Sequence, residues 1–193
     1  MRKVLISLLL TFLFYLFQVC IMPYLPIFDI VGNALLAYIA VIAVTYSPFY
    51  AYISGALAGI LMEIMLAPFM IINLVIFPTL SVIGAYIFSD KNERRLERDR
   101  NMRKEVKNTS PFIRIPLCAG VMAFAREVIS RIYVYLGGFS VTYQHILRAF
   151  VAIGYTILIA LIIMIPVRHL LGVHFIKSAQ AGSSRIERVK WVG

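Results

Sequence analysis

Residues 50–73 read YAYISGALAGILMEIMLAPFMIIN, and this stretch decides the fold. Ala51, Gly55, Gly59 and Glu63 are spaced four apart, so a helix places them on one face. Small residues let two helices in lipid approach closely. A carboxylate inside a bilayer costs about 2.5–3.5 kcal/mol, so Glu63 should face protein or a wet cavity. The four residues therefore predict a helix-packing or partner interface, in which the acid is either merely tolerated or functional.

The composition around this stretch indicates a membrane protein. The chain has 193 residues, of which 61% are hydrophobic and 15% charged, and its mean hydropathy is +0.87. Apolar runs of about 20 residues, the length that crosses a bilayer, recur along it. We predict an all-α membrane protein, a bundle of six transmembrane helices in residues 1–171. The expected spans are approximately 4–22, 30–46, 50–66, 70–88, 113–137 and 147–171, with a charged cytoplasmic loop at 89–111 and a basic cytoplasmic tail at 172–193.

The distribution of charge predicts the orientation of these spans. The net charge is +10, and the basic residues lie mostly in the N-terminal flank, the central loop and the tail. With both termini in the cytoplasm, all three segments fall on the cytoplasmic side, as the positive-inside rule requires. The opposite loops hold Asp29, with Arg148 only near one edge. We therefore expect a multi-pass protein of the bacterial cytoplasmic membrane that contacts anionic lipids and no nucleic acid.

The central charged segment, Ser89 to Ser110, contains eight Lys or Arg and five Asp or Glu residues. Opposite charges three or four residues apart are typical of a solvated helix. The segment is either a cytoplasmic linker that anchors the topology or a docking surface for a cytoplasmic partner.

Polar residues inside the predicted spans are candidates for a structural or functional role. They are Asn73 in the fourth span and Arg126, Glu127 and Arg131 in the fifth. Glu127 and Arg131 are four apart and should pair along their helix. Arg126 is then left over at a depth of about 20 Å, similar to that of Glu63, so we expect these two residues to pair across the bundle.

No motif for catalysis or metal binding occurs in the sequence, so no cofactor and no enzymatic activity are expected. Cys20 and Cys118 lie in apolar spans and are interpreted as small buried hydrophobic residues. His145, His169 and His174 lie where spans meet their flanks, which favours lipid or loop contacts.

The pattern resembles the MreD family of rod shape-determining membrane proteins. The resemblance rests on Gly55, Gly59 and Glu63, a break at Ala67-Pro68, a short preceding span and Asp29 in the loop before it. The family more usually has Asp where this chain has Glu63, and a glycine-rich break where it has Ala67-Pro68.

The resemblance implies a non-enzymatic membrane scaffold of the cell-elongation complex that makes peptidoglycan. Its partners would be MreC and the elongation machinery, namely the MreB filament, the RodA glycosyltransferase and a class B penicillin-binding protein.

Two alternatives stay open. The first is the substrate-binding S component of an energy-coupling-factor vitamin transporter, also a six-span bundle, whose fold MreD-like proteins are thought to share. Its solute site would draw on Tyr133, Tyr135, Tyr143 and Gln144. The second is an intramembrane enzyme or lipid-handling protein built on Glu63, Arg126, Glu127 and Arg131.

Overall fold

The computed structural model describes residues 2–46, 48–66, 72–89, 110–138 and 142–170. Within these ranges the chain forms six α-helices and no strand, which confirms the predicted all-α class. Most of the predicted charged loop and all of the predicted tail lie outside the described residues. The helices are α1 (Arg2–Leu16), α2 (Ala34–Thr45), α3 (Pro48–Leu66), α4 (Ile72–Phe88), α6 (Pro111–Leu136) and α7 (Tyr143–Leu170).

The first helical run continues beyond α1. A π-helical turn, Phe17–Ile21, and a 3-10 turn, Met22–Tyr24, follow it directly. After these turns Ile27 and Ile30 exchange two backbone hydrogen bonds of 3.0 Å each and close a tight hairpin. This hairpin leads into α2.

Helix α2 is the centre of the molecule. Every side chain from Ala34 to Val44 is 0% exposed. The helix is apolar on all sides (ALLAYIAVIAVT), and a helix of that kind is stable only when its whole circumference is covered. Helix α2 therefore has no polar face and is enclosed by the rest of the bundle.

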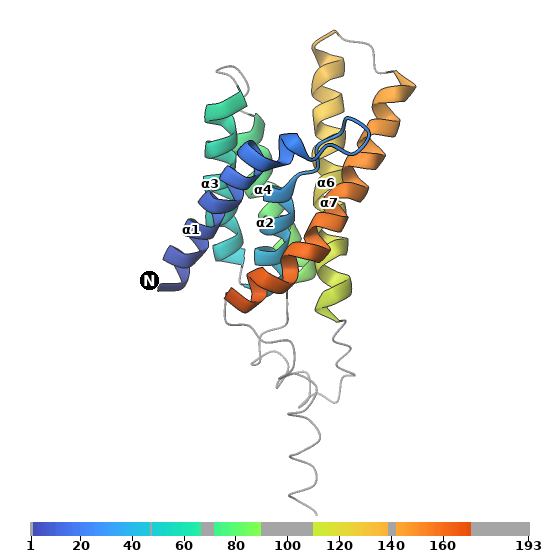
Figure 1. The fold of residues 1–193 in the computed structure, drawn as a ribbon. Helices are drawn as coiled ribbons and strands as arrows, with labels where there is room; N and C mark the ends of the chain where they lie inside the picture. Colours follow the sequence, from blue (N-terminus) through green and yellow to red (C-terminus); the bar gives the residue numbers. More distant parts are fainter. Residues whose placement is uncertain (1, 47, 67–71, 90–109, 139–141, 171–193) are drawn as a thin grey trace, which may run out of the picture.

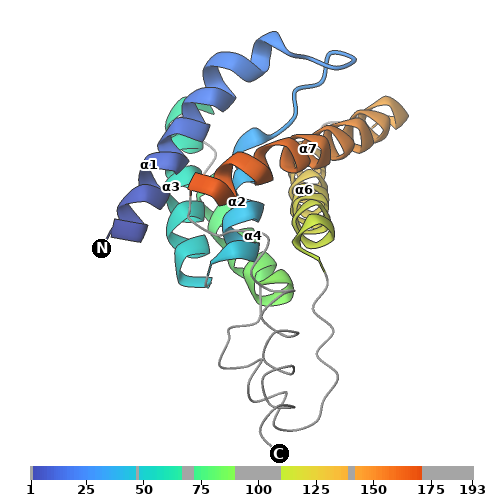
Figure 2. The ribbon, with the colours of Figure 1, turned by 60° about the horizontal axis from the view of Figure 1, so that its bottom comes forward.

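The other five helices surround α2 (Figures 1 and 2). Helix α3 packs on α1 and most extensively on α4, and α6 packs on α4 and α7. Helices α3 and α6 are therefore separated by α2 and α4. Figure 1 shows the chain running alternately up and down, with α6 ending and α7 beginning at one end, called the upper end below. Helix α4 ends and α6 begins at the opposite, lower end.

Among the described residues, two helical runs are long and apolar enough to cross a membrane, Val4–Tyr24 and Tyr143–Leu170. The 12 residues of α2 cover only about 18 Å, less than the roughly 30 Å of a bilayer core. Six complete crossings therefore stay a prediction. The shorter apolar helices are Ala34–Thr45, Pro48–Ile64 and Ile72–Phe88.

Candidate functional site

The small-residue face of α3 is filled by α4. A methyl group added to Gly55 would lie 2.9 Å from the carbonyl oxygen of Phe77 and would also overlap Ser81. A methyl group on Gly59 would lie 2.8 Å from the carbonyl oxygen of Asn73. Backbone atoms cannot move aside as a flexible side chain can, so both positions need glycine. The structure thus places the small-residue face in a contact between two helices of the same chain, called the α3–α4 seam below.

Ala51 and Glu63 complete the predicted interface on α3, and Asn73, predicted as an intramembrane polar residue, lies on α4 against Gly59. Ala51 is fully buried, and Asn73 is buried on α4 with its carbonyl against Gly59. Glu63 is partly exposed. Its Oε2 atom is buried and has no hydrogen-bond partner among the described residues. Glu63 is the one residue of the predicted interface whose polar group α4 does not satisfy.

The expected pair between Glu63 and Arg126 is wrong. Arg126 instead makes an ion pair with its neighbour Glu127, with 3.3 Å between Nη1 and Oε1. The reason lies in the packing, because Glu63 belongs to α3 and Arg126 to α6, on opposite sides of α2 and α4. Similar depth along two helices does not bring their side chains together.

Glu127 is shared by two guanidinium groups. Its second oxygen, Oε2, lies 3.0 Å from Nη2 of Arg131, one helical turn further on, as the four-residue spacing predicted. The side chain of Glu127 is 15% exposed, against 24% for Arg126 and 30% for Arg131. This charged triad is half-buried in the C-terminal half of α6 and carries one excess positive charge.

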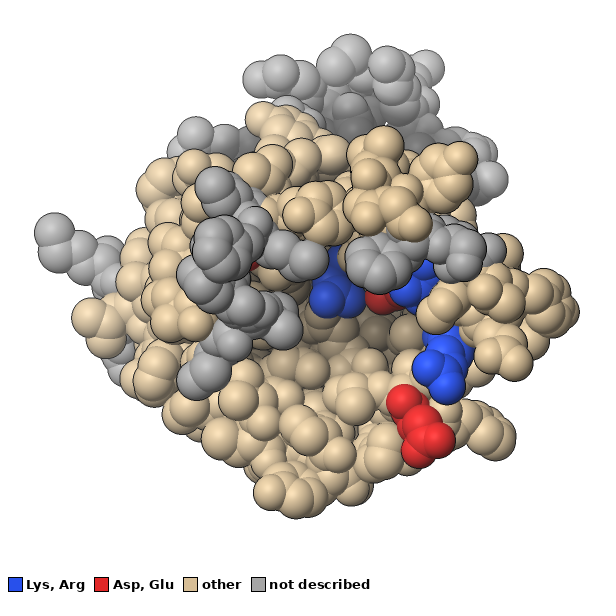
Figure 3. Space-filling model, turned by 90° about the horizontal axis from the view of Figure 1, so that it is seen from above, with Lys and Arg blue, Asp and Glu red and all other residues tan. Residues whose placement is uncertain are grey.

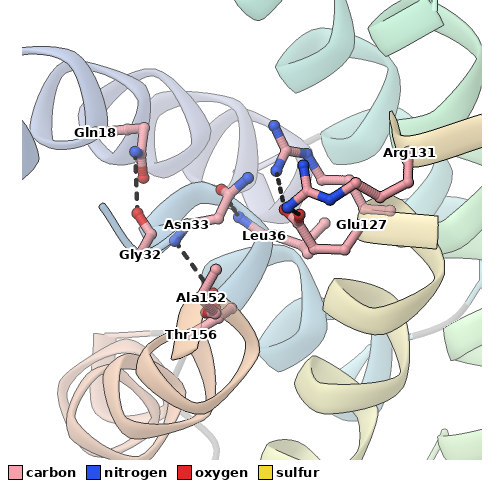
Figure 4. Close-up of polar contacts among 9 residues, drawn as sticks. Gln18, Gly32, Asn33, Leu36, Glu127, Arg131, Ala152 and Thr156 are labelled. Carbon is pink, nitrogen blue, oxygen red and sulfur yellow. Dashed lines mark hydrogen bonds and ion pairs between the residues drawn. The ribbon is translucent and has the colours of Figure 1, made fainter. Parts of the chain in front are cut away.

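The triad lies beside the capped start of α2 (Figure 4). The side chain of Asn33 accepts a hydrogen bond from the backbone N–H of Leu36. The backbone N–H of Asn33 donates to the hydroxyl of Thr156 on α7 at 3.2 Å. Gln18, in the π-helical turn, accepts from the N–H of Ala34 at 2.6 Å. These bonds satisfy donors at a helix start that is buried in protein.

A cavity of about 20 Å³ lies between these groups, enough for about one water molecule. Figure 3 looks down on the upper end and shows basic and acidic side chains gathered around a hollow. The cavity is lined by Val31, Asn33, Leu36, Ala123, Arg126, Glu127, Ala152 and Thr156.

Sequence reasoning missed a second polar cluster, between α1, α2 and α3. The Ser7 hydroxyl lies 2.7 Å from that of Ser54. The backbone carbonyl of Ser7 accepts hydrogen bonds from the hydroxyls of Tyr38 and Thr11 at 2.9 and 2.8 Å. All four side chains are buried. The signal available was a set of hydroxyl residues within apolar runs, which are common in membrane helices and do not identify their partners.

The remaining predicted residues are dispersed. Cys118 is buried as predicted, but Cys20 is exposed, so the prediction of two buried cysteines is wrong for Cys20. No group of three or more His, Cys, Asp or Glu side chains in the described ranges is placed to hold a metal ion. His174 lies outside the described residues. Exposed positions away from the cavity are Tyr133, Tyr135, Tyr143, Gln144, His145 and His169.

In comparisons with known proteins, no family model, no curated protein and no solved structure matches the chain. The resemblance to the MreD family therefore stays a prediction from the residues of α3.

Proposed function

We propose that the chain is a six-span protein of the bacterial cytoplasmic membrane with both termini in the cytoplasm. The observation that supports this most is the distribution of polarity. Hydroxyl groups such as those of Ser7 and Thr11 are buried, while the outer faces of the peripheral helices are apolar. That distribution suits a solvent of lipid, in which backbone and side-chain polar groups must be satisfied inside the bundle. Exposed apolar side chains include Leu5, Leu9, Leu13, Leu117, Phe124, Ile162 and Ile165.

We further propose that it acts as a non-enzymatic scaffold of the cell-elongation complex and binds an MreC-like protein. The support is the resemblance carried by Gly55, Gly59 and Glu63. Because α4 occupies the glycine part of the seam, the partner contact is assigned to Glu63 and the surface around it. A buried carboxylate oxygen with no donor among the described residues is a group that a partner's donor would satisfy.

The test is co-purification of the tagged protein with the MreC-like protein of its native host after mild detergent extraction. The parent should retain that partner, and Glu63→Gln should accumulate normally in the membrane but lose it. Glu127→Gln is the matched control, since it removes an acid on the other side of the bundle and should keep the partner. Recovery of paired ATPases with a transmembrane coupling subunit would contradict the scaffold role and favour a solute-binding subunit.

A further inference from the structure

The charged triad of α6 lies towards the upper end and does not enter the proposed contact at Glu63. Each of its guanidinium groups uses a single terminal nitrogen to bind Glu127. The other terminal nitrogens, Nη2 of Arg126 and Nη1 of Arg131, have no acceptor among the described residues. The Nε atoms of both side chains are buried and also have no acceptor in the described part of the chain. Two charged groups with spare donors in a half-buried place favour an anion that supplies acceptor oxygens.

Helix α7 carries a third arginine, Arg148, one turn from the cavity beside the triad. Arg148, Ala152 and Thr156 are spaced four apart, so they lie along one line of the helix. Ala152 and Thr156 line the cavity beside the triad, and Arg148 is exposed one turn nearer the upper end. Arg148 on α7 and Asp29 in the hairpin are the exposed charged residues that these two segments add at the upper end.

An exposed apolar stripe on α6 leads directly to the triad. Leu117, Val121, Phe124 and Val128 recur every three or four residues and are 39–55% exposed. Arg131 continues this stripe three residues after Val128. In a bilayer the stripe would face acyl chains and Arg131 would lie at the level of the headgroups, where basic side chains reach for the interface.

We propose that Arg126, Arg131 and Arg148 form a binding site for a phosphate group at the upper, outward end of the bundle. The planar guanidinium fork matches phosphate oxygens in pairs, and the apolar stripe indicates that the phosphate belongs to a lipid headgroup whose chains lie along α6. Glu127 binds one terminal nitrogen of each α6 guanidinium group and offsets part of their positive charge. The site rests on the membrane embedding proposed above and not on the scaffold role.

The test measures lipid retention by the full-length protein in nanodiscs and by native mass spectrometry. The probes are phosphatidylglycerol and a galactolipid with the same acyl chains and no phosphate. We expect the parent to retain phosphatidylglycerol selectively and Arg131→Gln to bind it about tenfold more weakly. Arg114→Gln is the control, because Arg114 lies at the lower end, where it donates to the Phe88 carbonyl at 2.6 Å. It should bind both lipids as the parent does.

Glu127→Gln distinguishes binding from a merely structural role. Removing the carboxylate raises the local positive charge, so this variant should retain phosphatidylglycerol as tightly as the parent or more tightly. If Glu127→Gln and Arg131→Gln weaken retention alike, or if Arg131→Gln binds like the parent, the proposal is overturned.

Adding inorganic phosphate tests whether the bound phosphate group comes from a lipid or from free phosphate. Free phosphate would be the ligand of the same site if added phosphate displaced the lipid and raised the melting temperature of the parent. Arg131→Gln should then abolish that rise. If the phosphate site is overturned, the predicted co-purification through Glu63 is not affected.

Discussion

The α3–α4 seam and the charged triad of α6 both pack polar groups inside an apolar bundle. They do so in opposite ways. At the seam, glycines remove side chains, so that the carbonyls of Phe77 and Asn73 pack against the backbone of α3. At the triad, two arginines and a glutamate stay half-buried and satisfy one another in part. The glycine part of the seam is therefore complete within the chain, whereas the triad keeps guanidinium donors that have no acceptor among the described residues.

The largest effect is expected from filling the seam. Gly55→Leu would drive a side chain into the Phe77 carbonyl and Ser81, so we expect a loss of about 3 kcal/mol or more and little accumulation in the membrane. The matched control is Gly154→Leu on α7, where no atom lies within 4 Å of an added methyl group. Quantitative immunoblotting of membranes and detergent melting curves measure both. Equal stability of the two variants would show that the seam is not tightly packed.

A smaller difference in stability is expected between variants of the two partly buried acids, Glu63 and Glu127. Glu127→Gln removes the carboxylate that two arginines share and should cost about 1–3 kcal/mol in nanodiscs made of phosphate-free galactolipid. Glu63→Gln breaks no ion pair among the described residues and should change stability by less than about 0.5 kcal/mol. Melting temperatures in those nanodiscs provide the measurement. A larger cost for Glu63→Gln would mean that its carboxylate has a partner within the chain.

Single hydroxyl groups around α2 should each contribute about 1 kcal/mol. Tyr38→Phe removes the donor to the Ser7 carbonyl, and Thr156→Val removes the acceptor of the Asn33 N–H at the start of α2. Thr79→Val is the control, because the Thr79 hydroxyl bonds only the carbonyl one turn earlier, at an exposed position. Unfolding in a denaturing detergent should rank the control as the least affected of the three.

The smallest effect is a stabilisation at the hairpin of the upper end. Phe28 and Asp29 have φ angles of 52° and 58°, in the left-handed region that favours glycine or asparagine. Asp29→Gly should relieve this strain and raise stability by about 0.5–1 kcal/mol. Val31→Gly, in the same connection outside the two left-handed positions, should not stabilise. Melting curves for both variants compare them, and a destabilising Asp29→Gly would show that its carboxylate is used.

The sequence indicated the positions of the helices but not how they are rotated against one another. Long apolar runs and the four-residue spacing of Gly55 and Gly59 depend only on local order, so they could be recognised directly. The partner of Arg126 could not, because it depends on which helix lies beside α6. The central place of α2 was similarly hidden: its short apolar run is recognisable in the sequence, but only the assembled ring of helices shows that all of its faces are covered. The hydroxyl cluster around Ser7 escaped notice because serine and threonine carry no spacing signal of their own.

The membrane topology is the central claim, and cysteine accessibility in spheroplasts tests it most directly. In a background with Cys20→Ala and Cys118→Ala, single cysteines replace Asp29 at the upper end, Ser110 at the lower end and Ile39 in the middle of α2. With a membrane-impermeant maleimide we expect Asp29→Cys to react in intact spheroplasts, Ser110→Cys only after permeabilisation, and Ile39→Cys in neither case. Reaction of Ser110→Cys from outside, or free labelling of Ile39→Cys, would contradict a membrane bundle built around a buried α2 with its basic end in the cytoplasm.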